Sequence, residues 1–131
     1  MRRNLIIVLT LITTAIHIYY YTTGPGLAFS GPDILFTFFL LNALGYLVLL
    51  GLLYLPLGLP DSLHRLVRPV FIGFTILTIL LYFIINIRSG IWSIPWAPIA
   101  KLDEVILVWQ LWAEGKVTMP VASQQKSETM L

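Results

Sequence analysis

The sequence has no cysteine and few charged residues, and both shortages narrow the classes of protein that it can encode. Without cysteine the chain forms no disulfide, cysteine-ligated zinc site or iron–sulfur cluster, and it has no thiol nucleophile. Charged residues make up 11% of the 131 residues, against about 25% in ordinary soluble domains. Hydrophobic residues make up 58%, and the mean hydropathy is +0.89. This composition places one small domain in a bilayer.

The sequence also lacks the usual signals of catalysis and cofactor binding. It contains no Ser-His-Asp signature, phosphate-binding glycine loop or specific paired-carboxylate motif, so we expect no enzyme and no catalytic residues. A haem held by His17 and His64 is excluded, because these residues are expected to lie apart by most of the ~30 Å hydrocarbon thickness. His17, Asp103 and Glu104 lack the spacing of a metal motif. We therefore predict no metal, no cofactor and, with a net charge of +2, no nucleic-acid partner.

Four apolar stretches separated by short turns rich in Gly and Pro predict four transmembrane helices. Residues 61–68 predict a separate amphipathic helix of one or two turns, with a bend at Pro69 before the third span. The first span resembles a signal peptide but has no convincing cleavage site, so we expect an uncleaved helix. The expected fold is all-α, an up-down-up-down bundle in a transmembrane domain of residues 1–113, followed by a polar tail of residues 114–131. The spans are expected at residues 4–21, 33–55, 70–87 and 99–112.

Basic and aromatic residues predict how the bundle is oriented. Arg2 and Arg3 precede the first span, Arg65 and Arg68 lie between the second and third, and Lys116 and Lys126 follow the fourth. By the positive-inside rule both termini face the cytoplasm, and the chain is an integral protein of the cytoplasmic (inner) membrane. The aromatic collars agree with this orientation. Tyr19–Tyr21, Trp92 and Trp96 mark the outer interface, and Trp109 and Trp112 mark the inner one.

Polar side chains that recur on one helix face predict the interior of the bundle. In the first span these are Thr10, Thr14, His17 and Tyr21, at i, i+4, i+7 and i+11. Several polar residues should meet near the outer end, and we name this group the outer polar cluster: His17, Asp33, Tyr82, Asn86, Asp103 and Glu104. The cluster is either a binding site for a cation, a proton or a small polar ligand, with His17 and Asp103 as a proton-bearing pair, or a set of groups that hold the helix ends together. The structural interpretation is the one that we favour.

A second group of polar residues lies in the predicted inner loop. His64, Arg65 and Arg68 are arranged to hold an anionic lipid headgroup. The alternative is that they serve the positive-inside topology alone, and the sequence favours this simpler interpretation.

Several short motifs resemble those of small, uncharacterised four-helix integral membrane proteins of archaea and bacteria. They are His17 late in the first span, the Phe39–Gly45 stretch, Tyr82 with Asn86, and the Pro-x-x-x-Lys-x-Asp-Glu opening of the fourth span. The resemblance covers about residues 5–112. It implies the four-helix membrane fold and brings no known activity.

These observations favour a non-catalytic accessory subunit of a larger membrane complex, of the electron-transport or photosynthetic kind. Its partners would be the lipid bilayer and other transmembrane subunits. The alternative is a small transporter or ligand-binding membrane protein that uses the outer polar cluster. An integral-membrane enzyme that acts on lipid is a third and weaker hypothesis.

Overall fold

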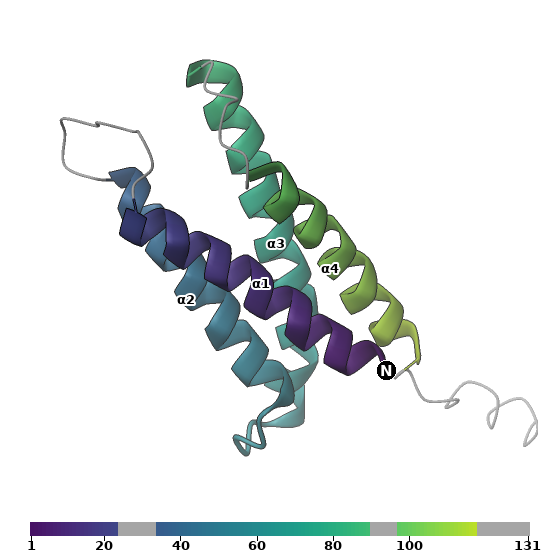
Figure 1. Cartoon of the computed structure of the whole chain (residues 1–131). Helices are drawn as coiled ribbons and strands as arrows, with labels where there is room; N and C mark the ends of the chain where they lie inside the picture. The colour runs from purple at the N-terminus through teal and green to yellow at the C-terminus, as the bar shows by residue number, and fades with distance from the viewer. Residues whose placement is uncertain (24–33, 90–96, 118–131) are drawn as a thin grey trace, which may run out of the picture.

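The protein folds into four α-helices in the computed structural model, which describes residues 1–23, 34–89 and 97–117 (Figure 1). The helices are α1 (Arg2–Thr23), α2 (Ile34–Tyr54), α3 (Asp61–Ser89) and α4 (Ala97–Val117). α1 packs against α2 and α4, and α3 packs against the same two helices, which closes a ring. This arrangement confirms the predicted all-α four-helix bundle.

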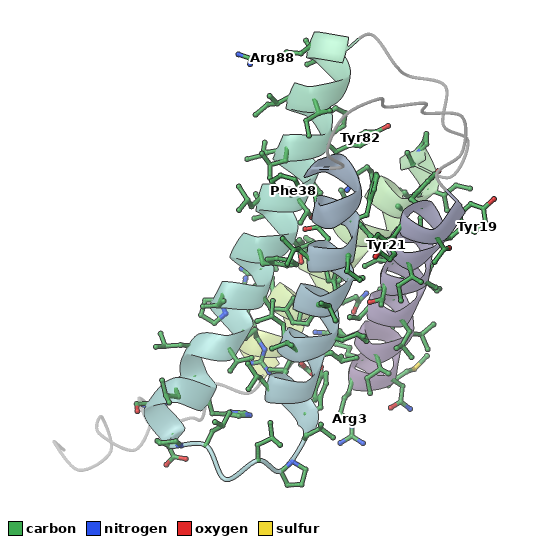
Figure 2. The ribbon with its side chains drawn as sticks, turned by 90° about the vertical axis from the view of Figure 1, so that its left-hand side faces the viewer. Arg3, Tyr19, Tyr21, Phe38, Tyr82 and Arg88 are labelled. Atoms are coloured by element: carbon green, nitrogen blue, oxygen red, sulfur yellow. The ribbon has the colours of Figure 1, made fainter. Side chains whose placement is uncertain are left out.

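The two ends of the bundle carry different residues, and we name them for use below. The terminal end is where α1 begins and α4 ends, and Arg3 lies there (Figure 2). The distal end is the opposite one, where Tyr19 and Tyr21 lie late in α1 and Phe38 lies early in α2 (Figure 2). Arg88 marks the far end of α3, which projects beyond its neighbours (Figures 1 and 2).

The first two predicted spans lie within two residues of the observed bounds of α1 and α2, and the fourth helix is longer than predicted. α4 continues for five residues beyond Trp112, through Gly115 to Val117. A glycine inside a helix costs about 1 kcal/mol relative to alanine. Here Glu114 offsets that cost, because its carboxylate binds Arg68 and Tyr54 on neighbouring helices. The first four residues of the predicted tail therefore belong to α4, and residues 118–131 lie outside the described part of the chain.

The predicted division of the third helix is wrong, because α3 continues through Pro69 as one helix of 29 residues. Proline removes one i→i−4 hydrogen bond from a helix, and packing on both sides compensates. Val67 and Phe71 are buried in the core, while the Pro69 ring is exposed. Leu63 and His64 start the helix by donating their backbone N–H groups to the Pro60 carbonyl.

A hydrophobic core fills the terminal half of the bundle, with side chains from all four helices. One close approach depends on glycine. A Cβ atom on Gly45 would lie 2.5 Å from Cζ of Phe74, so only glycine leaves room for this ring between α2 and α3. The core comprises Ile6, Leu9, Tyr46, Leu49, Leu53, Val67, Phe71, Leu107 and Leu111.

Buried positions on α1 and α4 follow a seven-residue repeat. On α1, Ile6, Thr13 and Tyr20 are buried at intervals of seven, and so are Thr10 and His17. On α4 the repeat passes through Ala97, Ala100, Glu104, Leu107 and Leu111. A repeat of 3.5 residues per turn keeps one stripe facing its neighbours when helices cross at a shallow left-handed angle. The bundle therefore packs like a short antiparallel coiled coil.

Polarity is reversed relative to a water-soluble protein, with polar groups inside and apolar groups outside. Among the described residues, the buried polar side chains are Thr10, Thr13, Thr14, His17, Thr75, Thr78, Asp103 and Glu104. Large apolar side chains cover the outer faces of the helices, for example Leu11, Leu44, Leu77 and Ile106. By length and composition, α1 and α3 could each cross a membrane. The crossing of the bilayer by all four helices remains a prediction.

Candidate functional site

Glu104 on α4 lies at the centre of the polar interior. It is 0% exposed. Its Oε2 atom accepts a hydrogen bond from Nζ of Lys101, 2.6 Å away and one turn earlier on the same helix. Thr13 on α1 and Thr78 on α3 place their hydroxyls 3.5 Å from the carboxylate. The carboxylate is therefore neutralised from its own helix and contacted by hydroxyls of two others.

Tyr46 brings the second helix into this group. Its hydroxyl lies 2.9 Å from Oγ1 of Thr78, whose hydroxyl in turn lies 3.5 Å from the Glu104 carboxylate. The ring packs edge-on against Phe74, with centroids 5.1 Å apart. We refer to the resulting set of side chains as the Glu104 cluster: Thr13, His17, Tyr46, Thr78, Lys101 and Glu104.

His17 has one ring nitrogen engaged and the other turned towards the carboxylate. Nδ1 lies 2.7 Å from the Thr13 carbonyl oxygen, so we assign the Nδ1–H tautomer, which donates this hydrogen bond. Nε2 then faces Oε1 of Glu104 at 3.9 Å. The imidazole is buried and stacks obliquely on Phe39 and Tyr46. This position holds the ring in one orientation beside the carboxylate.

Asp103 is buried beside the Glu104 cluster without a matching cation. It is 7% exposed, and its Oδ2 atom has no hydrogen-bond partner within the described ranges. Successive helical residues are rotated by about 100°, so Asp103 and Lys101 lie on opposite sides of Glu104 around α4. Lys101 points towards α3, where its Nζ lies 5.2 Å from the centre of the Tyr82 ring. Asp103 therefore faces the α1 side.

The structure brings together four of the six residues of the predicted outer polar cluster. His17 and Glu104 are in direct contact, Asp103 is adjacent in sequence, and Tyr82 joins through Lys101. Asp33 lies outside the described residues, and so does the side chain of Asn86.

Four members of the Glu104 cluster were not among the predicted site residues: Thr13, Tyr46, Thr78 and Lys101. Two of them had a sequence signal. Opposite charges three residues apart predict the Lys101–Glu104 pair, and Thr13 lies one turn before His17. Tyr46 and Thr78 needed the register of α2 against α3, which the sequence alone does not supply.

The predicted inward position of Tyr21 is wrong. Tyr21 is 41% exposed, whereas Tyr20 is 4% exposed and stacks on Phe39 at 5.5 Å. The prediction used 3.6 residues per turn over eleven residues. The interface instead follows the seven-residue repeat, which brings Tyr20 into line with Thr13.

The residues predicted to hold a lipid headgroup do not converge on one point. Arg68 donates to Oε2 of Glu114 at 3.2 Å, and the Tyr54 hydroxyl donates to the same oxygen at 2.8 Å. His64 is exposed, and its Nε2 lies 3.2 Å from the Leu53 carbonyl. Arg65 is exposed on the same turns of α3. Arg68, Glu114 and Tyr54 instead form an interhelical link at the terminal end, which we name the Glu114 link.

No protein-family model, curated protein or solved structure matches the chain. The resemblance to small four-helix membrane proteins is therefore still a prediction. In the described part of the chain, no group of three or more His, Asp or Glu side chains is arranged to hold a metal ion.

Proposed function

We propose that this chain is an integral membrane protein whose four helices cross the bilayer. The observation that supports this proposal best is the reversed polarity of the bundle. Although α4 contains Asp103 and Glu104, both are buried against its neighbours, and its exposed side is apolar. Between Ile99 and Trp109 that exposed side presents Ile99, Leu102, Val105, Ile106 and Trp109, and the exposed Lys116 lies in the last turn. A helix whose charges face the bundle interior can lie in lipid.

The proposed orientation places the terminal end in the cytoplasm. The basic residues Arg2 and Arg3 begin α1, Arg65 and Arg68 belong to the first turns of α3, and Lys116 lies in the last turn of α4. The antiparallel arrangement brings all of these turns to one end of the bundle (Figure 1). Both termini then face the cytoplasm, and the protein belongs to the cytoplasmic membrane.

The absence of cysteine makes this orientation directly testable, because any introduced thiol is the only one present. Ser62 at the start of α3 and Thr22 at the end of α1 are both exposed. We expect a membrane-impermeant maleimide to label Thr22→Cys in intact cells and Ser62→Cys only after the membrane is opened. Labelling of both variants in intact cells, or of neither after lysis, would contradict the proposed topology.

We further propose that the protein is a non-catalytic accessory subunit of a larger membrane complex. Two features favour this role. The groups of the Glu104 cluster bind one another, as expected for a structural core, and apolar side chains on every outer face are available to neighbouring transmembrane helices. The assignment to an electron-transport or photosynthetic complex rests on the sequence-based hypothesis alone.

Purification from native membranes in a mild detergent tests this role. A tagged copy should elute with stoichiometric partner subunits, in an assembly much larger than the 14.8 kDa chain. A tagged variant with Trp109→Ala and Ile106→Ala on the exposed side of α4 serves as a matched comparison. Recovery of the unaltered protein as a monomer would refute the accessory-subunit role but leave the membrane topology standing.

A second candidate is a small transporter or ligand-binding membrane protein. The burial of His17, Asp103 and Glu104 in one place favours it, since ionisable groups inside a membrane often mark a pathway. If this candidate is correct, His17→Ala abolishes binding or transport while the protein still accumulates in the membrane. Failure of this variant to accumulate would identify His17 as a structural residue.

A further inference from the structure

Within the described ranges, the interior of the bundle contains two adjacent carboxyl groups, Asp103 and Glu104, and one ammonium group, that of Lys101. Nζ of Lys101 is committed to Glu104, at 2.6 Å from Oε2. It also lies over the ring of Tyr82 on α3, which fixes it on the side of α4 away from Asp103. Because Lys101 and Asp103 are separated by about 200° around the helix, the ammonium group does not neutralise both carboxylates.

Among the described residues, no other ion pair supplies a positive charge to Asp103. On α1, the ionisable side chain near this level is His17, whose Nδ1 is bound to Thr13 and whose Nε2 faces Glu104. α2 and α3 contribute the neutral phenols Tyr46 and Tyr82 to the surroundings of the Lys101–Glu104 pair. The cations at the terminal end are engaged there, with Arg68 bound to Glu114 and Arg2 bound to the Ala113 carbonyl.

Ionisation of Asp103 would therefore leave a buried negative charge without a partner. Its Oδ2 atom has no hydrogen bond within the described residues, and the side chain is 7% exposed. An unpaired carboxylate in such a site is strongly unfavourable, and the usual outcome is that the group takes up a proton. In the part of the chain that the structure describes, no group of three or more His, Asp or Glu side chains is placed to hold a metal ion here, whereas a proton needs only the one carboxylate.

We propose that Asp103 is a buried proton-binding site, and that its proton allows α4 to stay closed against α1. Glu104 remains the ionised partner of Lys101. Loss of the Asp103 proton places two negative charges beside one positive charge at the α1–α4 contact and weakens it. This inference concerns the interior of the bundle and does not rest on the accessory-subunit role.

Infrared spectroscopy of the purified full-length protein in detergent tests the proposal. We expect a carbonyl-stretch band of a protonated carboxyl group near neutral pH, which shifts in D2O and disappears as the pH is raised. The band should be absent in Asp103→Asn and present in Asp61→Asn, a matched control in the exposed first turn of α3. The band should also persist in the single variant Asp33→Asn, because Asp33 is the third of the three aspartates in the sequence.

Labelling of the unaltered protein with 13C-carboxyl aspartate keeps the proposal falsifiable if Asp103→Asn fails to fold. The proposal requires the band to shift on aspartate labelling. A band that shifts only with labelled glutamate would assign the proton to a glutamate such as Glu104 and overturn the proposal. The absence of any protonated-carboxyl band at neutral pH would overturn it as well.

The pH dependence of thermal unfolding gives a second measurement. A carboxyl group that is protonated when folded and ionised when unfolded stabilises the folded state less as the pH rises. The unfolding midpoint of the unaltered protein should therefore fall with increasing pH, and the fall should be smaller in Asp103→Asn. Equal slopes for the two proteins would count against a proton on Asp103.

Discussion

Two glutamates of α4, ten residues apart, form contrasting interactions with the rest of the bundle. Glu104 is bound by a lysine of its own helix, and two other helices contribute hydroxyl groups. Glu114, about 15 Å further along the helix, is bound by Arg68 of α3 and Tyr54 of α2. The Glu114 side chain is 15% exposed and that of Glu104 is 0% exposed.

The Arg68–Glu114 and Lys101–Glu104 ion pairs therefore have different structural roles. The Glu114 link ties three helices together at the end of the bundle, where both charged side chains are partly exposed to solvent. The Lys101–Glu104 pair adds no helix-to-helix ion pair, because both charges lie on α4. Its role is to make a buried carboxylate tolerable, so that hydroxyl groups of the other helices can gather around it. The interior pair is thus more sensitive to the loss of one partner than the terminal pair.

The largest expected effect comes from removing the cation of the interior pair. Lys101→Met leaves Glu104 buried without its neutralising partner, and we expect a loss of about 3–5 kcal/mol in stability. Thermal unfolding in detergent, or recovery of monodisperse protein, measures this loss. The double variant Lys101→Met/Glu104→Gln should regain much of it. A single variant as stable as the unaltered protein would show that Glu104 does not depend on Lys101.

Gly45→Ala should disturb the Glu104 cluster through packing alone. The new methyl group would lie 2.5 Å from the Phe74 ring, which supports Tyr46 and hence the contact with Thr78. We expect destabilisation of about 1–3 kcal/mol, typical of overpacking. Phe74→Leu in the same chain should reduce that loss. The control is Gly73→Ala, at the position next to Phe74 on α3. No neighbouring group lies within 4 Å of the Cβ atom added there, so this variant should be close to neutral in stability.

Breaking the terminal link should cost less than breaking the interior pair. Arg68→Met removes the cation from Glu114, but Tyr54 still donates to the carboxylate and the site is partly solvated. We expect a loss of about 1 kcal/mol after solvent screening. A double-mutant cycle with Glu114→Gln isolates the pair from the packing of the arginine stem. A loss as large as that of Lys101→Met would remove the distinction between the two glutamates.

The smallest expected effect is that of salt. Screening weakens exposed ion pairs far more than buried ones. Raising the salt concentration should therefore lower the contribution of the Arg68–Glu114 pair, measured by the same double-mutant cycle. The coupling between Lys101 and Glu104 should stay constant. If salt lowered the coupling energies of both pairs equally, the two pairs would be equally exposed to solvent, and the contrast drawn between them would be wrong.

The sequence was informative where a residue acts within its own helix. Apolar length predicts four helices, and spacing along one helix places Thr10, Thr14 and His17 on an inward face. It was less informative where helices meet. The register of α2 against α3 decides that Tyr46 reaches Thr78, and no local pattern encodes that register. The same limit explains Tyr20, since its burial follows from the crossing of α1 over its neighbours and not from an ideal helical wheel.

Pro69 is a second position where tertiary packing overrides a local sequence signal. Proline predicts a break because it lacks one hydrogen-bond donor. The burial of Val67 and Phe71 on either side is a tertiary effect that a single sequence does not display, and it keeps α3 in one piece.

If the bundle crosses the bilayer as we propose, the continuity of α3 has a consequence for the thickness of membrane that suits this protein. With 29 residues, the helix is about 43 Å long, whereas the hydrocarbon core measures about 30 Å. The surplus of about 13 Å is close to the length of the eight residues 61–68, which would stand in the headgroup layer and cannot fold back as a separate segment. A thinner membrane must therefore tilt α3 as a rigid rod, and with it Thr78 and the hydroxyl contact that it makes with Glu104.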